Sequence, residues 1–375
     1  MDFDSLEPAI DPSNRITFLL DWELTLKCNL DCSYCITGIH GGHDNSIAHP
    51  PLNECLKTID FMYEYVDLYM SQKPKGIKYV ILNVYGGESL YHPNIVEILA
   101  ACRQRYQDQY QKEWHLTITT TTNAIVSEKQ IDKIIPLIDE FTCSYHTEST
   151  DKQKQQFKHN LIKIKSAEKR LKVVVLMHAE SELFADAQEL TDWCNMHQIR
   201  TLPRQLDHGS KKTQFNYDAQ QVKWFDSMYQ TKSFKTQPNV DLKVVEEKFD
   251  LADSGRACCG GRQVCKDVNQ RQRHFFVENK FPDWFCSVNE FFLFIKQVNG
   301  EIYVNKDCKM NFLGEVAPIG TLGNTQALLD WTRNNLNNQT MPVIQCKKSR
   351  CSCGLCAPKS KNLETFNSIM RKYRI

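Results

Sequence analysis

The sequence predicts an α/β fold in which helices cover a parallel sheet, followed by a smaller cysteine-rich α+β region. Strand-like and helix-like patterns alternate six times between residues 15 and 210, as in a parallel sheet with right-handed crossovers. Polar clusters follow these strands at their carboxyl ends, where parallel α/β sheets carry their chemistry. Nine of the sixteen cysteines lie after residue 257. Spacing alone leaves a closed barrel and an open doubly wound sheet as alternatives.

Each element is justified by its own pattern. Apolar or β-branched runs predict strands at residues 16–26, 79–85, 116–122, 140–145, 171–177 and 199–206. Apolar residues at helical spacing predict helices at 52–70, 93–106, 128–137, 150–165 and 183–197. Ser149 or Thr150 can cap the fourth helix. Cys55, Cys102, Cys143 and Cys194 fall inside these elements, so we expect them to be buried apolar fillers.

Composition and charge argue against a nucleic-acid-binding, membrane-spanning or secreted protein. The chain has 375 residues with a formal net charge of +1, which gives no global field towards nucleic acid or an anionic membrane surface. The start has no secretory signal, and no run approaches the length of a membrane span. A cysteine-rich chain of this kind is expected to be cytoplasmic and to bind metal rather than form disulfides.

The first cysteine group lies in the loop after the first strand. Cys28, Cys32 and Cys35 are spaced by four and three residues. Three thiolates do not complete a structural zinc site, which needs four ligands. They can hold three irons of a 4Fe–4S cluster and leave the fourth iron open to a small molecule. The alternatives are a buried cluster of reduced cysteines or half of a zinc site.

This motif resembles the CxxxCxxC motif of the radical S-adenosylmethionine (radical SAM) enzymes, and Tyr34 matches the aromatic residue before its third cysteine. The resemblance implies that the open iron binds SAM, whose reductive cleavage gives a 5′-deoxyadenosyl radical. It also implies a partial (β/α)6 TIM-like barrel over residues 15–210. An electron donor such as flavodoxin or ferredoxin would be the redox partner.

The same resemblance assigns further cofactor contacts. Gly86, Gly87 and Glu88 end the second strand and match the segment that contacts the SAM amine. Asn123 and Ser144, at the ends of the third and fourth strands, are expected near the ribose and carboxylate, and Tyr34 near the adenine. No residue is assigned as the base or hydrogen donor. The candidates at later strand ends are His146, His178 and Asp207.

The second cysteine group resembles the SPASM or twitch extension, which carries auxiliary iron–sulfur clusters. Cys286 and Cys308 flank an expected hairpin that turns at Asn299-Gly300. The spacing departs from the usual pattern, so one or two auxiliary 4Fe–4S clusters are expected, with a zinc site as the alternative. The candidate ligands are Cys258, Cys259, Cys265, Cys286, Cys308, Cys346, Cys351, Cys353 and Cys356.

The predicted organisation is an N-terminal arm (1–14), the core barrel (15–210), a helical linker (211–255) and the auxiliary cluster domain (256–375). The predicted function is a radical SAM oxidoreductase of the maturase type that abstracts hydrogen from a peptide. A dehydrogenase or mutase of a small molecule is the alternative. A hypothesis of another class is a non-catalytic iron–sulfur or zinc redox sensor. Neither a membrane nor a nucleic-acid partner is expected.

Overall fold

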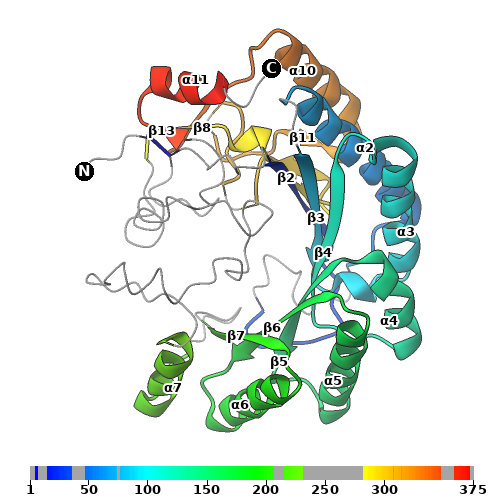
Figure 1. Cartoon of the computed structure of the whole chain (residues 1–375), viewed down its shortest axis with the longest axis vertical. Coiled ribbons are helices and arrows are strands. Elements are labelled where there is room, and N and C mark those ends of the chain that lie inside the picture. Colours follow the sequence, from blue (N-terminus) through cyan, green and yellow to red (C-terminus); the bar gives the residue numbers. More distant parts are fainter. Residues whose placement is uncertain are drawn as a thin grey trace.

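The computed structural model describes residues 5–6, 15–35, 47–73, 77–206, 215–230, 282–306, 308–313, 315–347 and 359–371. The predicted six parallel strands are present and neighbour one another in chain order. They are β2 (Arg15–Thr25), β3 (Ile77–Gly86), β4 (His115–Thr122), β5 (Glu140–His146), β6 (Arg170–Met177) and β7 (Arg200–Gln205). The sheet curves into an arc, as expected for a partial barrel (Figure 1).

Helices between the strands cover the outer side of this arc (Figure 1). They are α2 (Leu52–Ser71), α3 (Ile95–Arg105), α4 (Glu128–Ile134), α5 (Asp151–Ser166) and α6 (Ser181–Met196), and α7 (Ala219–Gln230) follows β7. Thr150 caps α5 in a capping box with Gln153, as its sequence position predicts. Short 3-10 turns at Ser89–Tyr91 and Ile135–Leu137 and a π turn at Tyr106–Tyr110 complete this part.

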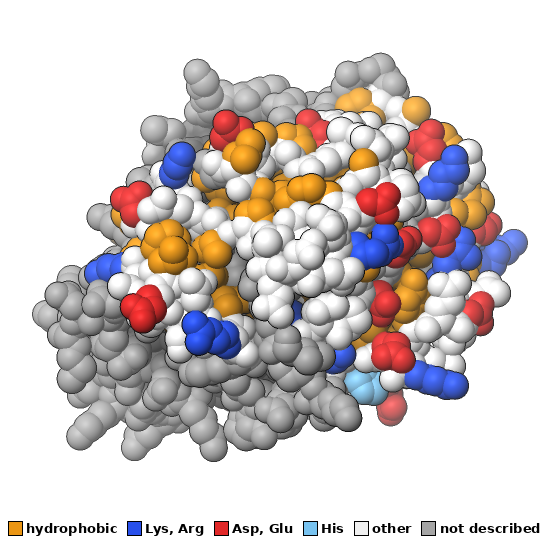
Figure 2. All heavy atoms as spheres, turned by 90° about the horizontal axis from the view of Figure 1, so that it is seen from above, with side chains coloured by type: hydrophobic (Ala, Val, Ile, Leu, Met, Phe, Trp, Pro, Cys, Tyr) orange, Lys and Arg blue, Asp and Glu red, His pale blue; other side chains and the backbone are white. Residues whose placement is uncertain are grey.

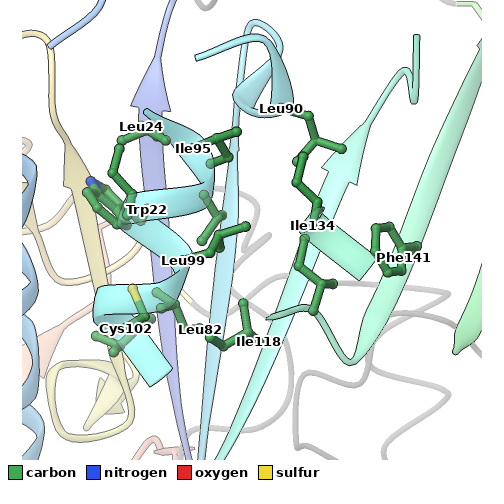
Figure 3. Packing of buried hydrophobic residues seen from close by; sticks show 14 of the residues in the cluster. Trp22, Leu24, Leu82, Leu90, Ile95, Leu99, Cys102, Ile118, Ile134 and Phe141 are labelled. Atoms are coloured by element: carbon green, nitrogen blue, oxygen red, sulfur yellow. The ribbon is translucent and has the colours of Figure 1, made fainter. Parts of the chain in front are cut away.

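The main core lies between the helices and the outer face of the sheet. Alternate residues of β2, such as Trp22 and Leu24, point towards Leu99 and Cys102 of α3 (Figure 3). The four cysteines predicted to be apolar fillers, Cys55, Cys102, Cys143 and Cys194, are fully buried. The inner face of the sheet carries the intervening, more polar residues, and this face is therefore the one that is available for a site.

A hairpin from the C-terminal region extends the parallel sheet. As predicted, β9 (Phe292–Lys296) and β10 (Glu301–Tyr303) pair antiparallel around the turn at Gly300. The sequence did not indicate that β9 also pairs parallel to β2, with Leu19 opposite Phe292 and Glu23 opposite Lys296. With β11 (Gly320–Thr321), the sheet has nine strands in the described residues. The C-terminal region thus shares a sheet with the core.

The rest of the described C-terminal region forms a smaller α+β unit. A second sheet contains β1 (Ser5–Leu6), β13 (Lys359–Ser360), β8 (Phe285–Cys286) and β12 (Ile344–Gln345). A 3-10 turn at Val288–Glu290, another at Leu322–Asn324, α10 (Thr325–Asn337) and α11 (Leu363–Arg371) accompany it. Part of the predicted N-terminal arm therefore belongs to this sheet, because β1 pairs with β13.

The surface agrees with the near-neutral charge of the sequence. On the face shown in Figure 2, acidic and basic side chains are intermixed among the described residues. Among the described helices, none has the length and apolar character that a membrane crossing requires.

Candidate functional site

The cysteine loop follows β2 and gathers the three predicted thiols. The backbone N–H of Cys35 donates to the carbonyl of Cys32 at 3.1 Å, which closes a tight turn. Burial raises the pKa of Cys28 to about 11 and the pKa of Cys32 to about 12, and the charges of neighbouring thiolates add to both shifts. Three sulfurs that repel one another's charge are a donor set that bound cationic irons would stabilise as thiolates.

These thiols fit an iron–sulfur cluster, which spreads its cysteine ligands over separate irons. Among the described side chains, no three cysteine, histidine or acidic groups are arranged to hold a single metal ion. The predicted assignment of Cys28, Cys32 and Cys35 to a cluster stays a prediction. Their chemistry and their proximity are consistent with it.

The glycine pair at the end of β3 packs directly on the backbone of the cysteine loop. Gly86 has φ of 153°, and a Cβ there would overlap the carbonyl oxygen of Thr25. A Cβ at Gly87 would lie 2.6 Å from the carbonyl oxygen of Lys27. The Gly87 N–H donates to the Thr25 carbonyl at 2.7 Å, and the Glu88 N–H donates to that of Lys27 at 3.0 Å. The glycines thus hold the loop against the strand end.

Glu88 joins the ends of β3 and β4. Its side chain is 1% exposed and accepts hydrogen bonds from Leu90 N at 2.9 Å, Thr122 Oγ1 at 2.7 Å and Asn123 N at 2.5 Å. Burial raises the pKa of Glu88 to about 7, although these donors oppose the shift. A carboxylate has about four lone-pair positions, so three donors from the chain leave room for a ligand ammonium.

The predicted contact Asn123 also holds the cysteine loop. Its amide Nδ2 donates to Asn29 Oδ1 at 2.6 Å, and Asn29 Nδ2 in turn donates to the carbonyl of Ile125 at 2.7 Å. Ser144 lies on the same inner face, on β5 between two residues of the outer core. Asn123 follows β4 and its Nδ2 lies 3.9 Å from Cys28 Sγ, whereas Ser144 lies on the adjacent strand β5.

His146, at the end of β5, contacts the cysteine loop rather than solvent. Its Nδ1 lies 3.3 Å from Cys32 Sγ and 3.0 Å from Tyr34 Oη, and its ring stacks on Tyr34 with centroids 5.9 Å apart. His178, at the end of β6, lies 6.4 Å from the Tyr34 ring. Of the three catalytic candidates, His146 thus contacts a thiol and His178 lies beside Tyr34 of the same loop. Asp207 lies outside the described residues.

Glu148, two residues after β5, also contacts the cysteine loop, although it is not among the site residues predicted above. It accepts from the backbone N–H of Ser33 at 2.7 Å and from the Ser33 hydroxyl, and it lies 3.7 Å from His178 Nε2. Nothing local indicates this, because the partners are 115 residues apart. His49 is a second residue not singled out: its Nδ1 lies 3.1 Å from Thr25 Oγ1.

The C-terminal cysteines are described only in part. Cys286, Cys308 and Cys346 are buried at 4%, 5% and 6% exposure in the smaller unit. Cys286 and Cys308 share one apolar cluster, and the Cys346 N–H donates to the carbonyl of Trp284 at 2.9 Å. The structure thus brings these three into one unit. The other six candidates, Cys258, Cys259, Cys265, Cys351, Cys353 and Cys356, lie outside the described residues.

Comparison with solved structures finds distant likenesses. Native anSMEcpe with bound AdoMet and a Kp18Cys peptide is 10% identical, covering 87% of this chain and 83% of that chain with a TM-score of 0.47. Histidine-tagged anSMEcpe with bound AdoMet is 9% identical, covering 95% and 93% with a TM-score of 0.48. HydG, a maturase of the FeFe-hydrogenase, is 12% identical, covering 57% and 49% with a TM-score of 0.35. At these scores the likeness carries no argument about substrate.

One protein family matches part of this chain by sequence. The family described as the Radical SAM superfamily matches residues 22–181, a range that includes the cysteine loop, the Gly-Gly-Glu segment and the ends of β4 and β5. Comparison with curated protein sequences finds no match. Residues 22–181, somewhat less than half of this chain, therefore match the radical SAM superfamily.

Proposed function

We propose that this chain is a radical SAM enzyme that holds a 4Fe–4S cluster on Cys28, Cys32 and Cys35. With SAM bound, such a cluster supplies the electron that cleaves the sulfonium to a 5′-deoxyadenosyl radical, which abstracts hydrogen from a substrate. The observation that carries the proposal is the docking of the cysteine loop on Gly86 and Gly87. This contact fixes the thiols beside the segment that would bind the cofactor.

The residues at the strand ends would bind and orient SAM. Glu88, with the backbone of Gly86 and Gly87, takes the methionine amine, because a buried carboxylate is a strong acceptor for an ammonium. Asn123 and Ser144 contact the ribose and carboxylate. Tyr34 packs near the adenine. In support, the Gly86-Gly87-Glu88 segment and Asn123 contact the cysteine loop at the carboxyl ends of β3 and β4, and Tyr34 belongs to that loop.

We further propose a peptide as the substrate and one or two auxiliary 4Fe–4S clusters in the C-terminal unit. Support comes from the order of a cysteine, a hairpin and a second cysteine, in which Cys286 and Cys308 share an apolar cluster next to β9 and β10. Ferredoxin or flavodoxin would supply electrons. A small-molecule dehydrogenase or mutase is the second candidate, because the same inner face can hold either kind of substrate.

The test is anaerobic reconstitution of the full chain, iron counting, and dithionite-driven SAM cleavage measured by chromatography of 5′-deoxyadenosine. We expect the nucleoside to form, and Cys32→Ala to abolish it while iron stays bound in the C-terminal half. Cys194→Ala, which removes a fully buried thiol of the outer core, is the matched control and retains activity. Absence of the nucleoside from a protein with full clusters would favour a non-catalytic redox sensor.

A further inference from the structure

A second polar cluster lies on the inner face of the sheet, where β2, β3, β9 and β10 run side by side. We call it the Glu23 site. It consists of Glu23, Tyr85, Lys296, Tyr303, Lys306 and Lys309. None of these residues belongs to the cysteine loop or to the predicted SAM contacts.

Glu23 is a buried carboxyl without a partner in the described part of the chain. Its side chain alternates with Trp22 and Leu24, which face the outer core, so Glu23 faces inward. It is 6% exposed, yet no hydrogen bond or ion pair engages its carboxyl group. Burial raises the pKa of Glu23 to about 7 although three lysines oppose the shift. Among the described residues, its carboxyl oxygens are not counted with the fully enclosed polar atoms that lack a hydrogen-bond partner, so they can still accept a hydrogen bond from a ligand.

Aromatic rings lie beside Glu23 on three of the strands, β3, β9 and β10. Tyr85 is the register partner of Glu23 on β3, and Phe294 of β9 lies opposite Asp21. The Phe294 ring lies 6.5 Å from that of Tyr85, with 12° between their planes, and 5.9 Å from that of Tyr303. Phe294 and Tyr303 are 2% and 8% exposed, so the half-buried Tyr85 is the ring of this group that a ligand can contact.

Three lysines bring positive charge to the site. Lys306 Nζ lies 5.1 Å from the Tyr85 ring centroid, and Lys309 Nζ lies 5.8 Å from that of Tyr303. Neither forms an ion pair in the described residues. Lys296 reaches Glu301 at 3.7 Å, also beside Tyr303. The charged groups that act on Glu23 are thus these three half-buried ammonium groups and the carboxyl group of Glu301.

The position of the Glu23 site relates it to the proposed SAM site. Tyr85 immediately precedes Gly86, and Glu23 lies two residues before Thr25, whose carbonyl accepts from Gly87 N. A molecule in the Glu23 site would therefore lie next to the Gly-Gly-Glu segment, on the inner face. This is where a substrate must lie if SAM binds at the strand ends.

We propose that the Glu23 site anchors the substrate through a carboxylate. Lys306 and Lys309 bind that carboxylate, Glu23 accepts an N–H or O–H of the same molecule, and Tyr85 packs on its apolar part. An acidic peptide and a small hydroxy acid both carry this chemistry. The inference rests on the proposed function, because it defines the substrate class of that reaction.

The test measures protection of lysines from acylation in the full, anaerobically reconstituted chain. Limiting acetic anhydride is added with or without each probe, and the modification of each lysine is quantified by mass spectrometry. The probes are acetyl-Gly-Glu-Gly-amide, its Gln counterpart, malate and the diamide of malate. At twice the dissociation constant of a probe, two thirds of the sites are filled, so modification of Lys306 and Lys309 slows about threefold.

Protection of Lys306 and Lys309 by an acidic probe, and not by its neutral counterpart, supports the proposal. The acidic probe that protects at the lower concentration shows whether the substrate is an acidic peptide or a small hydroxy acid. Exposed Lys112 is the internal control and stays unprotected. No protection by any probe, or equal protection by the neutral probes, overturns the proposal.

A variant provides a second test. In the double variant Lys306→Gln with Lys309→Gln, we expect acidic probes to lose their protection of Lys296. The single variant Lys309→Gln replaces it if circular dichroism shows that the double variant does not fold. Retained protection overturns the role of these lysines. SAM cleavage is measured separately on the unmodified chain, so its failure would count against the proposed function alone.

Discussion

The carboxylate of Glu148, two residues after β5, accepts both the backbone N–H and the hydroxyl of Ser33 in the cysteine loop. The N–H distance is 2.7 Å, and both groups are partly buried. A hydrogen bond to a charged acceptor contributes about 1.5–3 kcal/mol. These bonds fasten the middle of the loop, between Cys32 and Tyr34, to the strand that carries Ser144 and His146.

Removing this acceptor is therefore expected to loosen the loop without unfolding the chain. Glu148→Ala should release iron to a chelator at least about tenfold faster than the unmodified chain, since one lost bond of this kind is worth a factor of ten or more. Glu148→Gln retains an acceptor and should be intermediate. Glu189→Ala, an exposed acid 3.5 Å from Lys158, is the matched control. Equal iron release in all variants would contradict the role of Glu148.

Gly87 is expected to tolerate no side chain, because a Cβ would lie 2.6 Å from the carbonyl oxygen of Lys27 and still closer to that of Leu26. Overpacking of this kind typically costs about 1–3 kcal/mol. Gly87→Ala should lower stability by this amount in urea unfolding and abolish SAM cleavage. Gly323→Ala is the control, since its nearest contact would be Thr321 Oγ1 at 3.9 Å. Full SAM cleavage by Gly87→Ala would show that the loop does not depend on this contact.

The sequence predicts the six parallel strands because each has its own apolar pattern, and local patterns also explain the buried cysteines such as Cys143. It predicts the hairpin of β9 and β10, but not that β9 pairs with β2, because that pairing joins segments more than 260 residues apart. The hydrogen bonds between Ser33 and Glu148 were not predicted for the same reason, because these residues are 115 positions apart in the sequence. Such contacts depend on how the sheet curves, which a single sequence does not encode locally.

The helices α10 and α11 were not predicted. In the sequence, Glu23 is one polar residue within an apolar strand pattern, and Lys306 and Lys309 are charged residues that follow a hairpin. Only the parallel pairing that sets Glu23 opposite Lys296 brings them together. The candidate site was more predictable, because its cysteine and glycine motifs are continuous in the sequence.

The pH dependence of stability should report on Glu23. Its pKa is about 7 in the folded chain, against 4.5 as the ordinary value, so the folded state holds the proton more tightly. The stability linked to this group is fully present below pH 4.5 and is lost as pH rises through 7. The facing charges are Lys296 of β9, Glu301 of β10, and Lys306 and Lys309 beyond it.

Glu23→Gln stays neutral at every pH, so it should remove this loss. Between pH 5 and pH 8, the variant should gain about 2–3 kcal/mol of stability relative to the unmodified chain, measured by urea unfolding at each pH. Exposed Glu54→Gln is the control and should run parallel to the unmodified chain. A constant difference between Glu23→Gln and the unmodified chain would mean that Glu23 titrates normally.

The C-terminal region should also be tied to the core by a buried ion pair. Lys73 Nζ, just after α2, lies 3.0 Å from Glu290 Oε2 in the turn before β9, and both side chains are 2% exposed. Lys73 also lies 4.7 Å from the Phe291 ring centroid. Because truncating one partner leaves a buried charge uncompensated, Glu290→Ala should lower the free energy of unfolding by about 3–5 kcal/mol.

The control is the exposed pair of Arg333 in α10 and Glu64 in α2, at 2.8 Å with 40% and 45% exposure. Solvent screens this pair, so Glu64→Ala should cost at most about 1 kcal/mol. Lys73→Met with Glu290→Leu removes both buried charges and should recover most of the stability that Glu290→Ala loses. If Glu290→Ala and Glu64→Ala cost the same in urea unfolding, the buried pair does not hold the hairpin region to α2.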